Sequence, residues 1–103
     1  MLKRMIHISK NGFPLILREI PVVLYGGGAA GRLICDLLIQ NDIRIMYIVD
    51  DSASLCGSYI RQIKVISYNE FCEYIKEYEK VAVIMTTIYG KSVLKKCVVY
   101  IIL

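Results

Sequence analysis

The sequence is poor in residues that bind transition metals or act as nucleophiles. His7 is the only histidine, and the four cysteines (Cys35, Cys56, Cys72 and Cys97) include no CxxC pair. Zinc sites need closely spaced Cys and His ligands, and a cysteine nucleophile needs a neighbouring base. The N-terminal residues also lack a signal-peptide pattern. We therefore expect no metal site and free thiols in a reducing cytoplasm, with Cys35 and Cys72 as small core residues.

Long apolar runs are absent as well, although 56% of the residues are hydrophobic and the mean hydropathy is +0.53. The longest runs, such as residues 98–103, are far shorter than the roughly 20 residues that cross a bilayer. Short apolar runs are typical of strands buried on both faces of a parallel sheet. We expect no transmembrane span, and membrane association only at the periphery or through a larger protein.

The charge pattern gives little support to nucleic-acid binding. The net charge of +4 arises from 13 basic and 9 acidic residues, and the basic ones are spread along the chain. A nucleic-acid interface usually shows a dense basic stripe with interleaved aromatic residues. We expect no nucleic-acid partner, while a positive balance remains compatible with a phosphate-bearing ligand.

Five short apolar runs alternate with helical patterns along most of the 103 residues. Strands are predicted at residues 22–25, 44–49, 63–66, 81–86 and 98–103, and helices at 29–40, 68–78 and 91–96. Ser67 and Glu70 form a capping-box pattern that predicts the start of the second helix. Residues 1–20 are predicted to be an N-terminal extension to a domain at residues 21–103. This extension contains the breakers Asn11, Gly12 and Pro14.

Strands that alternate with helices favour parallel pairing with right-handed crossovers. The predicted fold class is therefore α/β, a three-layer αβα Rossmann-like domain. Its sheet should be parallel and five-stranded with the order 3-2-1-4-5, numbered from the strand at Val22.

A glycine-rich segment joins the first predicted strand to the first predicted helix. Gly26, Gly28 and Gly31 fit the pattern GxGxxG, which is weak alone but informative between a strand and a helix. Gly26 would permit the sharp turn, Gly28 would let a phosphate approach the backbone, and Gly31 would let the helix pack closely. Ala29 opens the helix, whose free N–H groups favour an anion. The alternative is a tight turn with a purely structural role.

Two acids follow the second predicted strand at the distance expected for ribose contacts. Asp50 lies about 20 residues beyond the glycines, and Asp51 adds a second charge that disfavours a 2′-phosphate. NAD is therefore favoured over NADP as the cofactor. Thr86 and Thr87 end the fourth strand and should face the glycine loop across the crevice. Alternatively, the paired aspartates simply begin a turn.

Catalytic residues are missing from these patterns. None of the eight tyrosines has a lysine four residues later, and no Ser/His/Asp set or Walker lysine is present. Outside the paired aspartates, no acid pair occupies a plausible cleft. The chain thus combines a predicted binding site with no predicted catalytic site.

The segments VVLYGGGAAGRLICDLL and YIVDDSASLCGSYIRQIKVIS resemble the small Rossmann-type domain of bacterial polysaccharide-biosynthesis proteins. The GGGAAGR loop is most similar to the nucleotide-binding domain of capsule-type nucleoside-diphosphate-sugar dehydratases and epimerases. The domain preceding the β-helix of sugar O-acyltransferases is related, but it usually has histidine where Ala30 stands here.

The resemblance covers roughly residues 22–103 and implies contacts with NAD or a nucleoside-diphosphate sugar. The implied contact residues are Gly26, Gly28, Ala29, Gly31, Asp50, Asp51 and Thr86. In both families the catalytic residues lie in a further domain. The resemblance therefore implies that this chain is a fragment of such an enzyme, a stand-alone binding module or a degenerate remnant.

Three functions remain open from the sequence. The first is a nucleotide-binding module of surface-polysaccharide metabolism. The second is the portion of a larger NAD-dependent dehydratase or epimerase, for which no catalytic set is visible here. The third is a ligand-free interaction domain or homo-oligomer, because an apolar edge strand at residues 98–103 could pair with a second copy.

Overall fold

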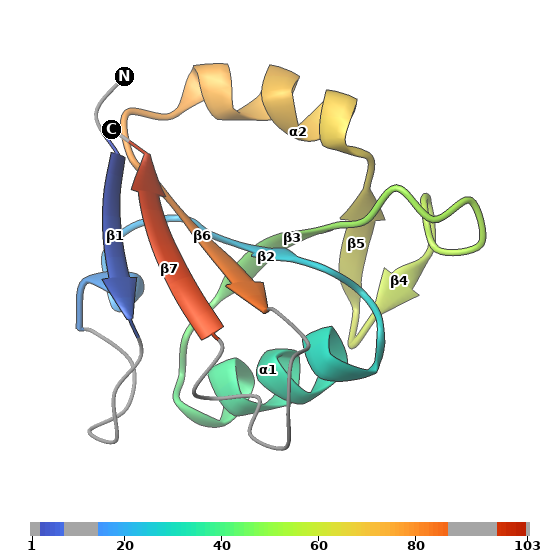
Figure 1. Ribbon diagram of the computed structural model, residues 1–103, viewed down its shortest axis with the longest axis horizontal. Helices are drawn as coiled ribbons and strands as arrows, with labels where there is room; N and C mark the ends of the chain where they lie inside the picture. The colour runs from blue at the N-terminus through green and yellow to red at the C-terminus, as the bar shows by residue number, and fades with distance from the viewer. Residues whose placement is uncertain (1–2, 8–14, 87–96, 103) are drawn as a thin grey trace.

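Apolar and β-branched runs form a mixed seven-stranded sheet with a helix on each face (Figure 1). The computed structural model describes residues 3–7, 15–86 and 97–102. The strands are β1 (Lys3–His7), β2 (Val22–Tyr25), β3 (Ile45–Val49), β4 (Tyr59–Ile60), β5 (Ile63–Ile66), β6 (Val81–Thr86) and β7 (Cys97–Ile102). The helices are α1 (Ala29–Gln40) and α2 (Tyr68–Tyr74), with short 3₁₀ turns η1 (Leu15–Arg18) and η2 (Ile75–Glu77).

The sheet is mostly parallel, with the strand order β1-β7-β6-β2-β3-β5-β4. The strands β5, β3, β2 and β6 pair in parallel, in line with the expected α/β class. The prediction of a wholly parallel five-stranded sheet is wrong, because β7 runs antiparallel to β6. The order of the whole sheet also differs from 3-2-1-4-5, since β1 and β4 are added at its edges.

The direction of β7 follows from the length of its connection to β6. Thr86 pairs with Cys97, so the chain leaves and re-enters the sheet at the same edge. The ten residues between them are fewer than the dozen or more that a parallel crossover needs. Antiparallel return is therefore the connection that this length allows. The helix predicted at residues 91–96 lies outside the described residues.

An N-terminal strand covers the far side of β7. Each residue of β1 from Lys3 to His7 pairs antiparallel with β7, in a register that sets Met5 opposite Tyr100. The prediction that residues 98–103 form a free edge is therefore wrong, because β7 has neighbours on both sides. Residues 3–7, assigned to an extension, form part of the same sheet.

A short hairpin after β3 was missed by the sequence patterns. β4 pairs antiparallel with β5 within the segment that we expected to be a loop. The two residues between them, Arg61 and Gln62, have φ values of 50° and 67°. Tight hairpins with two such residues usually contain Asn or Gly, so Arg-Gln carried no recognisable turn signal.

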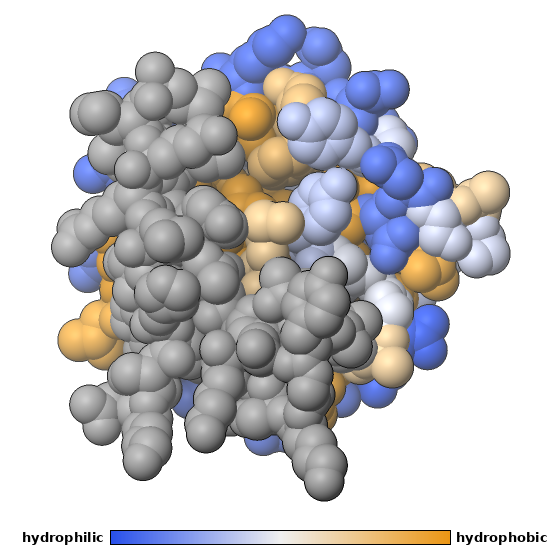
Figure 2. Space-filling view, in the orientation of Figure 1, coloured by the Kyte–Doolittle hydropathy of each residue, from blue (hydrophilic) through white to orange (hydrophobic). Residues whose placement is uncertain are grey.

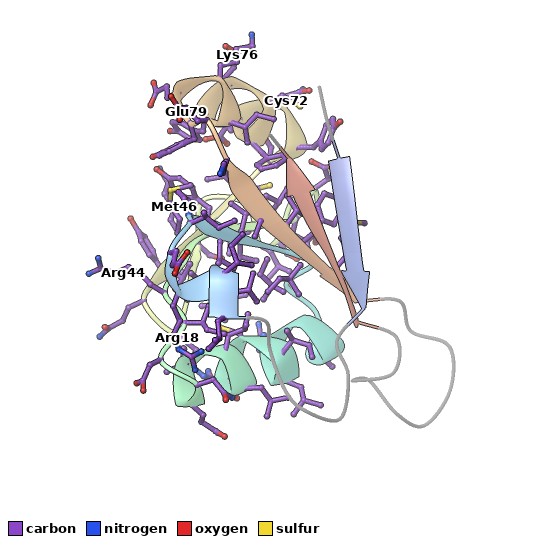
Figure 3. The ribbon with its side chains drawn as sticks, turned by 90° about the vertical axis from the view of Figure 1, so that its left-hand side faces the viewer. Arg18, Arg44, Met46, Cys72, Lys76 and Glu79 are labelled. Atoms are coloured by element: carbon purple, nitrogen blue, oxygen red, sulfur yellow. The ribbon has the colours of Figure 1, made fainter. Side chains whose placement is uncertain are left out.

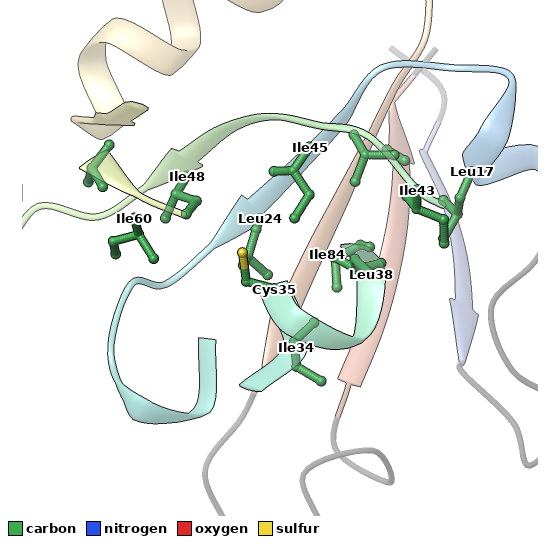
Figure 4. Packing of buried hydrophobic residues seen from close by; sticks show 13 residues of the cluster. Leu17, Leu24, Ile34, Cys35, Leu38, Ile43, Ile45, Ile48, Ile60 and Ile84 are labelled. Atoms are coloured by element: carbon green, nitrogen blue, oxygen red, sulfur yellow. The ribbon is translucent and has the colours of Figure 1, made fainter. Parts of the chain in front are cut away.

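Two apolar layers hold the helices against the sheet. On one face α1 packs Ile34, Cys35 and Leu38 against Leu24 and Ile84 (Figure 4). On the other face α2 packs Phe71 against a cluster that includes Val23, Val49, Ile66, Val81 and Val83. Cys35 is fully buried as expected, whereas Cys72 is only half-buried.

The helix boundaries follow local signals. α1 has the predicted bounds, and α2 begins at the predicted capping box, in which Ser67 accepts from the Glu70 N–H. α2 itself ends at Tyr74, and η2 continues the turn. Among the described residues, neither helix has the length and apolarity needed to span a bilayer. In the view of Figure 2, hydrophilic residues gather over α2 and over the loop that follows β3.

Candidate functional site

The carboxyl ends of the parallel strands meet at one edge of the sheet. The register sets Tyr25 beside Val49 of β3 and beside Met85 of β6. The next residues along the chain are Gly26 after β2 and Asp50 after β3. This edge therefore brings together the predicted glycine loop and the predicted acids. In parallel α/β sheets, ligands bind at this edge.

Two glycines have mechanical roles that the sequence pattern anticipated. Gly26 has φ of +112°, a conformation that residues with a Cβ rarely adopt, and its N–H donates to the Val49 carbonyl at 2.8 Å. A Cβ on Gly31 would overlap the carbonyl oxygen of Gly26. Glycine at these two positions therefore lets β2 turn sharply into α1 and lets α1 pack against the turn.

Gly28 differs from the other two glycines because the fold does not require it. It is the N-cap of α1, with φ of −76° and ψ of −167°, a conformation open to any residue. A Cβ there would have no neighbour within 4 Å, and the residue is exposed. A side chain at this position would occupy only the space outside the α1 N-terminus. Because glycine has no side chain, the space in front of the α1 N-terminus is open at this position.

The first backbone N–H groups of α1 lack the side-chain acceptors that cap the start of α2. The first N–H groups of any α-helix have no acceptor within the helix. In α1 no side chain caps them and no acidic residue lies in the first turn. In α2 the Ser67 hydroxyl accepts from Glu70 N–H, and the Asp51 carboxylate accepts from Tyr68 N–H at 2.9 Å. Of the two helices, α1 thus presents uncompensated donors and a positive dipole end.

Asp50 lies beside the glycine loop but is engaged with the protein backbone. One carboxylate oxygen accepts from Gly27 N–H at 2.8 Å, and the other accepts from Ser52 N–H at 2.8 Å. A carboxylate has about four acceptor sites, so the two bonds leave capacity for a ligand hydroxyl. Asp50 is half-buried, which keeps part of the carboxylate accessible. It therefore combines a structural role with the position expected for a ribose contact.

Asp51 is directed to a different place. Its bond to Tyr68 N–H fixes the start of α2, so this carboxylate caps a helix instead of pairing with Asp50. Asp50 thus contacts the glycine loop, whereas Asp51 contacts the start of α2. The second negative charge that we expected beside Asp50 therefore belongs to a carboxylate that caps α2.

The remaining predicted residues are placed only in part. Ala29 is the exposed first residue of α1. Met85 pairs with Tyr25, and Thr86 and Gly26 are the next residues of these neighbouring parallel strands. The Thr86 backbone therefore lies on the β6 side of the glycine loop. Thr87 lies outside the described residues.

The loop after β3 packs onto the glycine turn, a contact the sequence did not reveal. Side chains of Leu55 and Ile60 lie so close to Gly27 that a Cβ there would meet them at 3.3 and 3.2 Å. The Cys56 thiol donates to the Asp50 carbonyl at 2.7 Å. Desolvation, followed by the Asp51 and Glu70 carboxylates, raises the pKa of this thiol. The thiol therefore stays protonated at neutral pH and serves as a donor.

Aromatic residues also stand at this edge, and the sequence patterns did not single them out. The rings of Tyr25 and Tyr68 lie 6.5 Å apart in an edge-to-face arrangement. Tyr25 precedes Gly26, and Tyr68 follows the cap Ser67. Because residues that follow strand ends gather at this edge, strand boundaries alone would have drawn attention to both.

Two grooves lie at the opposite edge of the sheet, where β3 begins. One, of about 550 Å³, lies between η1 and β3 and is lined by residues that include Arg18, Arg44 and Met46 (Figure 3). The other shares Arg44 and extends to Arg61. These grooves are separate from the glycine loop. In the part of the chain that the structure describes, no cluster of His, Cys, Asp or Glu side chains could hold a metal ion.

Comparison with known proteins does not assign the chain to a family. No protein-family model matches the chain, and no curated protein and no solved structure is significantly similar to it.

Proposed function

We propose that the chain is a nucleotide-binding module that holds the phosphate groups of its ligand on the N-terminus of α1. The observation that carries the proposal is Gly28, which is exposed, unstrained and free of neighbours, at a helix start with no cap. Backbone angle and packing require glycine at positions 26 and 31 but not at 28, where Ser, Asn or Asp would cap the helix better. A phosphate that approaches the backbone explains it, because a Cβ would stand in its path.

NAD or a nucleoside-diphosphate sugar is the proposed ligand. Asp50 is the acceptor for a sugar hydroxyl, since it lies beside the loop and keeps unused acceptor capacity. Ala29 and the Thr86 backbone complete the proposed contacts on either side of the loop. The link to surface-polysaccharide or nucleotide-sugar metabolism rests on the sequence resemblance. The proposal assigns binding to this chain and leaves any catalytic step to another domain or protein.

A pair of isosteric substitutions at Gly28 tests the phosphate contact. Gly28→Asp and Gly28→Asn both supply a good helix N-cap, so neither variant should lose stability. Only the aspartate adds a negative charge where the phosphate is proposed to lie. We expect the Asp variant to bind at least about tenfold more weakly than the Asn variant. Both should bind more weakly than the unchanged chain because of their bulk.

Calorimetry of the full chain with NAD, NADP and uridine-diphosphate sugars supplies the measurement, and thermal unfolding supplies the control for the fold. Absence of heat from every ligand at millimolar concentration would contradict the proposal. Equal affinities for the Asp and Asn variants would contradict the placement of the phosphate at Gly28.

The second candidate is an interaction domain that has lost its ligand. The observation in its favour is that both aspartates have internal partners, Gly27 and Ser52 for Asp50 and Tyr68 for Asp51. In this case the Gly28 variants would behave alike in every binding assay. The same calorimetry therefore separates the two candidates.

A further inference from the structure

An anchored and half-exposed aromatic ring contacts Tyr25, the residue that precedes the glycine loop. Tyr68 is the first residue of α2, and its backbone is held by the Asp51 carboxylate at 2.9 Å. Its ring contacts two others, with centroids 6.5 Å from Tyr25 and 6.3 Å from Phe71. Despite these contacts Tyr68 remains 48% exposed, whereas Phe71 is only 5% exposed. The ring is thus fixed on its protein side and open on the other.

The position of this ring relates it to the proposed phosphate site. Tyr25 immediately precedes the loop, and three residues of chain span at most roughly 11 Å. Gly28 and the Tyr25 backbone are therefore within reach of one nucleotide. The Asp50 carboxylate accepts from Gly27 N–H in the same segment and keeps acceptor capacity for a sugar hydroxyl. Phosphate donors, a hydroxyl acceptor and an aromatic ring thus share the carboxyl edge of the sheet.

We propose that Tyr68 stacks on the base of the nucleotide, with Tyr25 and Phe71 holding its ring in place. This inference rests on the proposed function, because it needs the phosphate on α1. It goes further by naming what distinguishes the ligand: an aromatic base joined to a diphosphate, rather than a diphosphate alone. Every base presents a π-face, so stacking on Tyr68 admits purines and pyrimidines.

Titration of three anions against matched variants tests the role of Tyr68. The anions are inorganic pyrophosphate, ADP and UDP, and the variants are Tyr68→Leu, Tyr68→Phe and Tyr59→Leu. Tyr59 is a suitable control because it is 66% exposed and lies on β4. We expect ADP and UDP to bind the unchanged chain roughly 5- to 100-fold more tightly than pyrophosphate.

The Leu variant of Tyr68 should lose this preference while keeping its affinity for pyrophosphate. Tyr68→Phe should retain the preference, because the ring and not the hydroxyl makes the contact, and Tyr59→Leu should change nothing. A preference that persists in Tyr68→Leu would overturn the role of Tyr68. Failure of the unchanged chain to bind any of the three anions would instead overturn the proposed function.

Saturation-transfer NMR on the unchanged chain provides a readout that does not depend on how the variants fold. Irradiation of the tyrosine ring protons should transfer more saturation to the base protons of ADP than to its ribose protons. Transfer that is equal or greater at the ribose would place the base away from Tyr68 and overturn the inference, even if ADP binds.

Discussion

The carboxylate of Asp50 accepts a hydrogen bond from the backbone N–H of Gly27 at 2.8 Å, although the two residues are 23 positions apart in the chain. This bond joins the end of β3 to the turn that leads from β2 into α1. Gly27 is buried beneath the side chains of Leu55 and Ile60, so water could not readily take the place of the Asp50 carboxylate as the acceptor of this bond. The shape of the glycine turn therefore depends on an acid from the neighbouring strand.

Removing the Asp50 carboxylate should destabilise the fold. Asp50→Ala leaves the Gly27 N–H without its acceptor, and we expect the free energy of unfolding to fall by about 1–3 kcal/mol. Asp50→Asn should cost less because its amide oxygen can still accept from Gly27. Asp36→Ala is a matched control, since it removes an acid from an exposed ion pair with Arg61 and should cost at most about 1 kcal/mol.

Urea unfolding followed by circular dichroism measures all three variants. If Asp50→Ala and Asp36→Ala lowered the unfolding free energy equally, the bond between Asp50 and Gly27 would stabilise the fold no more than an exposed ion pair does.

Adding one methyl group at Gly31 should disrupt the contact between α1 and the turn. The new Cβ would overlap the Gly26 carbonyl oxygen, which belongs to the backbone and cannot rotate away. We expect Gly31→Ala to lower the free energy of unfolding by about 1–3 kcal/mol or more, despite the higher helix propensity of alanine. Gly28→Ala provides the control, because its Cβ would meet no neighbour, and it should change stability by less than about 1 kcal/mol.

Thermal unfolding of the two variants distinguishes a tight contact from a general effect of glycine loss. A smaller loss of stability for Gly31→Ala than for Gly28→Ala would contradict the close packing of α1 on the turn.

The buried thiol of Cys35 should make stability depend on alkaline pH. Burial, followed by the nearby Asp36, raises the pKa of this thiol. The folded state therefore holds the proton more tightly than the unfolded chain, whose thiol pKa is about 8.5. The resulting stabilisation is fully present below that value and is lost as pH rises through the higher folded pKa.

Unfolding free energies measured in reductant from roughly pH 7 to 10 test this linkage. They should fall more steeply with pH in the unchanged chain than in Cys35→Ala. The alanine variant should be less stable throughout, because it leaves a cavity in the core. Parallel pH profiles would show that Cys35 contributes nothing to the pH dependence.

For the candidate site, the sequence predicted which residues gather but not how they are used. Gly26, Gly28 and Asp50 could be placed at one edge because each lies just after or near the end of a recognisable strand. The division of labour between Asp50 and Asp51 could not, because it depends on which N–H groups the fold brings within reach. The end of β5 could have drawn attention to Tyr68, but its contacts with Tyr25 and Asp51 could not be predicted, since those residues are distant in sequence.

By itself the sequence determined the elements whose causes are local. The bounds of α1, the capping box at Ser67 and the turn at Gly26 follow from hydrophobic spacing, side-chain caps and the backbone freedom of glycine. Only the tertiary structure decided the direction of β7, the place of β1 at the edge and the bond between Asp50 and Gly27. These features depend on pairing between distant segments, where the length of a connection and the complementary edge of a strand outweigh local preference.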